Sequence, residues 1–279
     1  MAAADVEASF DVQWAALSEL DVRLGRTTPE LTEAVRARGL SRIAHLLDTD
    51  PAGAWVASGD DGAVVGCALA FVRDGMWFLS LLMVLPAVQG TGIGRELLDR
   101  TLTTATDRSW ILATSDPAAL RRYLLAGFEL HPTFTAQGIP GELLAPAGVT
   151  VGDYDRHGGV VDEVARYVRG AGLAQELPWL EGRPVPFLVV DDSDGRGFCF
   201  TRPGGIVTLG ATTEHAARRL LLAALRANNG EVEVDWLSAD QQWAIEVCIE
   251  ARLTLMAGAT VCLRGQPRMS PYLPSGAIG

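Results

Sequence analysis

The pattern of apolar and polar positions in the first half of the chain predicts alternating helices and strands. Apolar residues at helical spacing favour helices, and the nearly continuous apolar run MWFLSLLMV indicates a strand buried on both faces. Thr27 or Thr28 would cap the second helix ahead of Pro29. The predicted elements are helices at 10–20 and 29–47, strands at 54–58, 63–72 and 76–84, a helix from 93 to about 106, a strand at 110–115, a helix at 117–126 and a strand from 128.

The second half of the chain repeats this order of elements. Between the halves, GIPGELLAPAGVT has the glycine and proline content of a linker. Strands that alternate with helices after a hairpin imply an α/β (α+β) fold with a mixed sheet flanked by helices. We therefore expect two tandem domains, 1–137 and 148–279. The repeated elements are a strand at 205–210, a helix at 213–228, a strand at 231–237, a helix at 239–251 and a strand at 259–265.

Composition narrows the class of protein. The chain has 279 residues, of which 48% are hydrophobic, enough for two cores, but no apolar stretch approaches the roughly 20 residues of a membrane span. The first residues lack a secretory pattern, so we expect a cytoplasmic protein without a membrane partner. The four cysteines have no metal-ligand spacing and are expected to be buried thiols, with no metal bound. A net charge of −11 argues against a nucleic-acid partner.

The segment VLPAVQGTGIGRELL places three glycines, Gly90, Gly92 and Gly94, between the buried strand and the following helix. Glycines allow positive φ and close approach, so successive backbone N–H groups can converge on an anion. The positive end of the helix dipole lies at the same point. A phosphate is the most plausible anion, and a tight turn whose glycines serve only packing is the alternative.

Gln89, Gly92 and Gly94 form a Q-x-x-G-x-G pattern preceded by V-x-P, which resembles the pyrophosphate loop of the GCN5-related N-acetyltransferases (GNAT). A second segment, DPAALRRYLLAGF, resembles the other signature of this family, with Tyr123 and the Gly-Phe pair at the expected spacing. Asp116 stands where the family has asparagine, and capping of the helix at Pro117 is its expected role. The resemblance covers about 10–135 and indicates a tandem bacterial member whose second domain is degenerate.

The resemblance implies that acetyl-CoA is the cosubstrate. The backbone of Leu82 and Val84 would pair with its pantetheine arm, and a strand-end amide near Val84 would stabilise the oxyanion. Tyr123 would protonate the leaving thiolate. Arg95 would either add charge at the phosphates or lie on a solvated helix face. The loop amides that would hold the pyrophosphate belong to Gln89, Gly90, Thr91, Gly92, Ile93, Gly94 and Arg95.

The residues do not single out a general base. Many family members carry a glutamate on the strand before the loop, and this strand has no carboxylate. Ser80 could position a water, and Glu129 and His131 follow on a later strand, but each has an ordinary structural explanation. The carboxylate of Gly279 would reach a site if the segment SPYLPSGAIG folds back, whereas its prolines and glycines equally describe a surface tail.

The second half lacks the glycine loop. Where the first half has QGTGIG, the second has GATTEH, and Glu214 at the helix start would repel a phosphate. The expected function is therefore transfer of an acetyl group from acetyl-CoA to an amine, on a small molecule or a protein, by direct attack in a ternary complex in the first domain. The alternatives are a non-catalytic acyl-CoA sensor or regulatory protein, and a structural tandem domain without a ligand.

Overall fold

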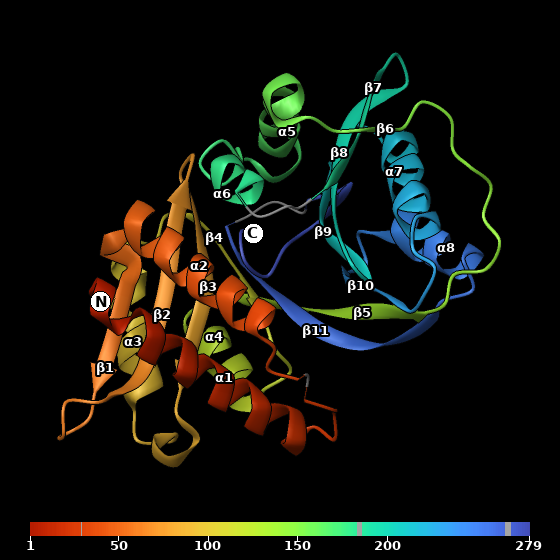
Figure 1. Cartoon of the computed structure of the whole chain (residues 1–279). Coiled ribbons are helices and arrows are strands. Elements are labelled where there is room, and N and C mark those ends of the chain that lie inside the picture. The colour runs from red at the N-terminus through yellow and green to blue at the C-terminus, as the bar shows by residue number, and fades with distance from the viewer. Residues whose placement is uncertain (29, 183–185, 266–268) are drawn as a thin grey trace. The chain divides into compact units, whose positions relative to one another are not determined.

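The computed structural model describes residues 1–28, 30–182, 186–265 and 269–279. The chain forms two compact units, Met1–Ile111 and Leu112–Gly279. The predicted domain ranges, 1–137 and 148–279, concern two copies of a fold rather than compact units, and they stay a prediction. Each unit is described by itself (Figure 1).

The N-terminal unit is a sheet covered by helices on both faces. Strands β1, β2 and β3 pair antiparallel in chain order, and β4 adds parallel to β3. The pleat sends successive side chains to opposite faces, so the Cys67 thiol bonds Ser9 O in α1 while Ala68 packs with Leu97 of α3. The elements are α1 (Val6–Arg23), α2 (Glu33–Thr49), β1 (Ala54–Ser58), β2 (Val64–Arg73), β3 (Met76–Val84), α3 (Ile93–Thr101) and β4 (Arg108–Ala113), of which β4 runs two residues past the end of the unit.

The C-terminal unit has the strand order β11-β5-β10-β9-β8-β7-β6, and β12 pairs with β9. Helices α5 and α7 pack on the strands β8 and β9 from opposite sides (Figure 1). The elements are α4 (Pro117–Leu125), β5 (Glu129–Gly138), β6 (Thr150–Val151), α5 (Tyr154–Arg169), α6 (Leu177–Glu181), β7 (Phe187–Asp192), β8 (Gly195–Arg202), β9 (Gly205–Ala211), α7 (Glu214–Arg226), β10 (Val232–Leu237), α8 (Gln242–Glu250), β11 (Thr254–Arg264) and β12 (Tyr272–Leu273).

Two cores of different composition hold the C-terminal unit together. Facing α5, the rings of Phe187 and Phe200 stack at 4.8 Å, and Tyr154 of α5 meets Phe187 edge-on at 4.9 Å. Facing α7, the core is mostly aliphatic, with Trp243 as its aromatic residue, and it includes Leu220 and Leu221, both fully buried. The unit thus buries an aromatic layer on one face and an aliphatic layer on the other.

Most predicted elements are confirmed, with corrections at their ends. Thr32 caps α2 by accepting from Val35 N, so neither Thr27 nor Thr28 is the cap, and Pro29 lies outside the described residues. Helix α3 ends at Thr101, and a 3₁₀ turn follows. Helices α5 and α6 and strands β6, β7, β8 and β12 were not among the predicted elements.

The predicted linker is tied to the C-terminal unit by hydrogen bonds. Gly141 N donates to Ala251 O at 3.0 Å, and the Arg219 guanidinium donates to Ala147 O at 2.8 Å. Arg219 also pairs with Asp192 at 2.8 Å. The connection between the two halves is therefore held against the body of the unit, although residues 139–149, between β5 and β6, form no helix or strand.

Gly39 of α2 permits close packing on α1, and this supports a stability prediction. A Cβ at Gly39 would lie 2.3 Å from Phe10 Cε2, and Phe10 is 1% exposed. We expect Gly39→Ala to lower the free energy of unfolding by about 1–3 kcal/mol, the usual cost of overpacking. Gly159→Ala in α5 is the matched control, because that Cβ meets nothing within 4 Å. Urea unfolding should show no loss for Gly159→Ala and even a gain of up to about 1 kcal/mol.

All four cysteines are buried free thiols, as expected. Among the described residues no helix combines the length and apolar character needed to span a bilayer. Within the same part of the chain no three His, Cys, Asp or Glu side chains gather as a metal-binding group.

Candidate functional site

Strand β3 carries a β-bulge where it separates from β4. The antiparallel register with β2 runs Leu69↔Leu81 and then Ala70↔Leu79, so Ser80 is the extra residue. Parallel pairing with β4 ends at the same place, with Leu79↔Ile111. Beyond the bulge, β3 has β2 on one edge and no strand on the other within the described part of the N-terminal unit.

The register aims the backbone of Leu82 and Val84 at this open edge. Leu85 N donates to Val65 O, which makes Gly66↔Val84 a non-hydrogen-bonded pair whose own N–H and C=O groups face away from β2. Leu82 has the same orientation, because orientation alternates with a period of two. The two residues predicted to pair with a pantetheine arm thus offer backbone groups to a further strand.

The glycine loop that follows is open. Gly90 and Gly92 have φ values of 81° and 104°, and a Cβ on either would meet nothing within 4 Å. At Gly94 the Cβ would touch only Val84 Cγ2, at an ordinary 3.5 Å. Packing within the chain therefore requires none of these glycines, although positive φ favours glycine at Gly90 and Gly92.

The amides of residues 90–94 donate no hydrogen bond to any part of the chain that the structure describes. By contrast, Gln89 N donates to Pro86 O at 3.3 Å and Arg95 N to Gly92 O at 2.9 Å. Gly92 is the N-cap of α3, so the free amides surround the positive end of its dipole. Free donors in open space at a helix N-terminus fit a diphosphate, while the amides of Gln89 and Arg95 already have acceptors in the chain. The full predicted set, Gln89 to Arg95, stays a prediction.

Side chains of the loop serve its conformation. Gln89 Nε2 donates to Val84 O at 3.0 Å and so joins the loop to the end of β3. Thr91 Oγ1 donates to Val88 O at 2.7 Å. Arg95 is largely exposed and lies 3.6 Å from Asp99 on the same helix. The side chains of Gln89 and Thr91 are thus engaged within the loop, and the main-chain amides remain the predicted anion-binding groups.

Tyr123 belongs to the C-terminal unit, on α4. Its side chain is 5% exposed, and burial, followed by the nearby Cys262, raises the pKa of its phenol above the ordinary value near 10. The phenol therefore stays protonated throughout the neutral range. Asp116 caps α4 by accepting from Ala118 N at 3.0 Å, which confirms its predicted structural role.

Of the residues considered as a general base, Ser80 is the buried bulge residue of β3. Glu129 and His131 lie together on β5, with Glu129 Oε2 3.5 Å from His131 Nε2. The carboxylate is largely exposed and the imidazole largely buried. This pair lies in the C-terminal unit and Ser80 in the N-terminal one.

The corresponding turn of the second half is built differently. Thr213 caps α7 by accepting from Ala216 N at 3.2 Å, and Thr212 N donates to Arg196 O at 2.7 Å. Glu214 occupies the first turn of the helix. The turn thus has a threonine side chain as its cap, which the glycine at position 92 cannot provide, and it carries an acidic side chain where an anion would approach.

Comparison with known proteins agrees with the resemblance that the loop carries. Residues 15–128 match the family model of the acetyltransferase (GNAT) family. This part of the chain is therefore similar to the GNAT family, whose chemistry is acyl transfer and whose cosubstrate is acetyl-CoA. No curated protein matches the sequence.

Solved structures share the fold over the whole chain. A candidate acetyltransferase from Pyrococcus horikoshii is 19% identical with a TM-score of 0.76, covering 100% of this chain and 94% of its own. A GCN5-related N-acetyltransferase from Sphaerobacter thermophilus is 17% identical with a TM-score of 0.56, over 96% and 95% of the two chains. A tandem GNAT protein of the clavulanic acid pathway is 18% identical with a TM-score of 0.58, over 96% and 98%. At these identities the likeness concerns the fold alone.

Proposed function

We propose that this protein is an acetyl-CoA-dependent N-acetyltransferase that transfers an acetyl group to an amine by direct attack in a ternary complex. The proposal depends on one observation. The backbone N–H groups of residues 90–94, at the N-terminus of α3 and beside open space, have no acceptor among the described residues. Charge-assisted bonds from such amides to a diphosphate are among the stronger hydrogen bonds in proteins.

The open edge of β3 supports the same proposal. The N–H and C=O groups of Leu82 and the N–H of Val84 suit the amides of a pantetheine arm, which would add to the sheet like a strand. A strand-end amide that also donates to the developing oxyanion would contribute about 2.7–4 kcal/mol to the transition state. Val84 O already accepts from Gln89, so its role is to fix the loop.

Tyr123 would act as the general acid. Collapse of the tetrahedral intermediate expels the thiolate of the coenzyme, and the Tyr123 hydroxyl would donate its proton to that sulfur. Burial raises the pKa of the phenol, so the proton is present at neutral pH. The acceptor amine must lose a proton before attack, because an alkyl ammonium with a pKa near 10.4 has no free electron pair.

Calorimetry with acetyl-CoA, followed by thiol release across a panel of amines, tests the function. We expect one saturable binding event and coenzyme release that depends on the acceptor. Binding without thiol release for any amine would favour an acyl-CoA sensor, a possibility suggested by the absence of a carboxylate on β3. If millimolar coenzyme gives neither binding heat nor a shift in melting temperature, both the acetyltransferase and the acyl-CoA sensor are excluded.

A further inference from the structure

The two halves of the chain build the same gap in the sheet with the same register. In the C-terminal unit β8 and β9 pair as Phe200↔Thr208 and then Thr201↔Ile206, so Val207 is a bulge like Ser80. Parallel pairing of β9 with β10 is confined to Gly205↔Glu233, just before this bulge. Each unit therefore contains a strand that bulges and then parts from its parallel neighbour.

The equivalence extends to individual backbone groups. Val84 lies four residues after the first bulge and Ala211 four after the second, and each is paired with a glycine, Gly66 or Gly197. Thr212 N donates to Arg196 O, so the N–H and C=O of Ala211 face away from β8, as those of Val84 face away from β2. By the same count Leu209 corresponds to Leu82.

In the C-terminal unit this edge is occupied by the chain itself. Strand β12 pairs antiparallel with β9 through Tyr272↔Gly210 and Leu273↔Leu209. Ala211 N donates to Pro271 O at 3.3 Å, so the counterpart of the Val84 amide already has an acceptor. Tyr272 and Leu273 are 0% and 1% exposed. A short peptide strand thus takes the position, relative to β9, that a pantetheine arm would take relative to β3.

Buried polar contacts hold the occupying segment in place. Thr208 Oγ1 donates to Leu273 O at 2.9 Å, and Tyr272 OH donates to Gly279 O. The Arg169 guanidinium, 1% exposed, donates to Ile278 O at 2.8 Å and Gly279 O at 3.0 Å.

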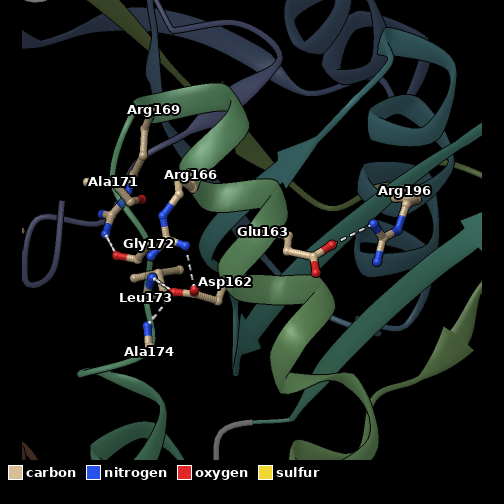
Figure 2. A network of polar contacts seen from close by, with 9 residues as sticks. All are labelled: Asp162, Glu163, Arg166, Arg169, Ala171, Gly172, Leu173, Ala174 and Arg196. Carbon is tan, nitrogen blue, oxygen red and sulfur yellow. Dashed lines mark hydrogen bonds and ion pairs between the residues drawn. The ribbon is translucent and has the colours of Figure 1, made fainter. Parts of the chain in front are cut away.

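The same guanidinium anchors the end of α5. It also donates to the carbonyls of Ala171 and Gly172, as Figure 2 shows. Beside it, Asp162 accepts from Leu173 N and Ala174 N. The occupying segment is therefore bound to the end of α5. Of the two alternatives for SPYLPSGAIG, a surface tail is wrong, because Tyr272, Leu273 and Ile278 are buried in the unit.

We infer that residues 271–273 are a built-in occupant of the second cofactor gap, which closes that gap to pantetheine-bearing ligands and leaves one coenzyme site in each chain. The inference rests on the proposed function for the comparison with the first gap. The inference does not depend on the composition of the turn before α7, because β12 covers the edge of β9 whatever residues that turn contains.

Amide-resolved hydrogen exchange on the full chain, with and without acetyl-CoA, tests the inference. We expect Ala211 to exchange slowly in the free protein and to change less than about 2-fold at saturating coenzyme, whereas Val84 slows by about 10-fold or more. The inference is overturned if Ala211 exchanges at an unprotected rate, if coenzyme slows it as it slows Val84, or if a titration saturates at two coenzymes per chain.

The variant Tyr272→Phe removes the hydroxyl that bonds the segment, and should speed exchange at Ala211 by about 5-fold or more while leaving coenzyme affinity unchanged. Tyr167→Phe, at an exposed tyrosine of α5, is the matched control and should change neither. If Tyr272→Phe does not fold, the wild-type measurements still decide. If wild type binds no coenzyme, the proposed function fails, and Ala211 exchange in the free protein still reports whether the segment occupies the gap.

Discussion

Gly92→Ala is expected to weaken acetyl-CoA binding by about 30-fold, which corresponds to about 2 kcal/mol. The methyl group would enter the open space where the diphosphate must approach the amides of residues 90–94. The φ of 104° at Gly92 is also unfavourable for alanine, so the loop would shift its donors. Isothermal titration with acetyl-CoA measures the change directly.

Gly62→Ala provides the matched control for backbone strain. Gly62 lies in the turn between β1 and β2, has a φ of 82° and, like Gly92, has nothing within 4 Å of its added Cβ. Both variants should therefore lose similar stability, by about 1–2 kcal/mol, but only Gly92→Ala should lose affinity. Equal affinities for the two variants would contradict the assignment of the loop.

Tyr123→Phe is expected to lower kcat by about 100-fold or more, with little change in the KM for acetyl-CoA. The hydroxyl is proposed to act only when the thiolate leaves, so its removal should spare binding of the ground state. Steady-state kinetics with the best amine of the panel gives both parameters. Equal losses in kcat and in coenzyme affinity would remove the acid role.

The raised pKa of Tyr123 adds a pH criterion. Its phenol titrates above the ordinary value near 10, so in wild type the proton is lost only well above that pH. Titration of Tyr123 should therefore cause no decline of kcat near pH 10. If kcat of the wild type does decline there, another group is responsible, and the pH midpoint of that decline should be the same in Tyr123→Phe. Tyr167→Phe again serves as the control, since Tyr167 is exposed.

Most helices and strands, and the glycine loop, could be predicted from the sequence because they depend on local patterns. The apolar run of β3, the glycines of the loop and the cap at Asp116 each have a signature within a few residues. The start of α2 was placed wrongly, because the sequence offers several threonines before the helix and pointed to Thr27 or Thr28, whereas Thr32 is the cap.

The bulges at Ser80 and Val207 had no such signature. A bulge depends on the register between two strands, and a serine or a valine within an apolar run does not predict one. The role of residues 271–273 was also beyond the sequence, since their partners on β9 are about sixty residues earlier and their burial needs the whole unit. For the same reason the segment looked equally like a surface tail.

The pairing of β5 limits how this chain can be divided. This strand precedes the connection between the halves, yet both of its edges are bonded to β10 and β11, which follow that connection. A fragment that stops after β5 would expose two rows of unsatisfied peptide groups and invite edge-to-edge aggregation. Either half expressed by itself therefore lacks strands that pair across this connection, and biochemical experiments should use the whole chain.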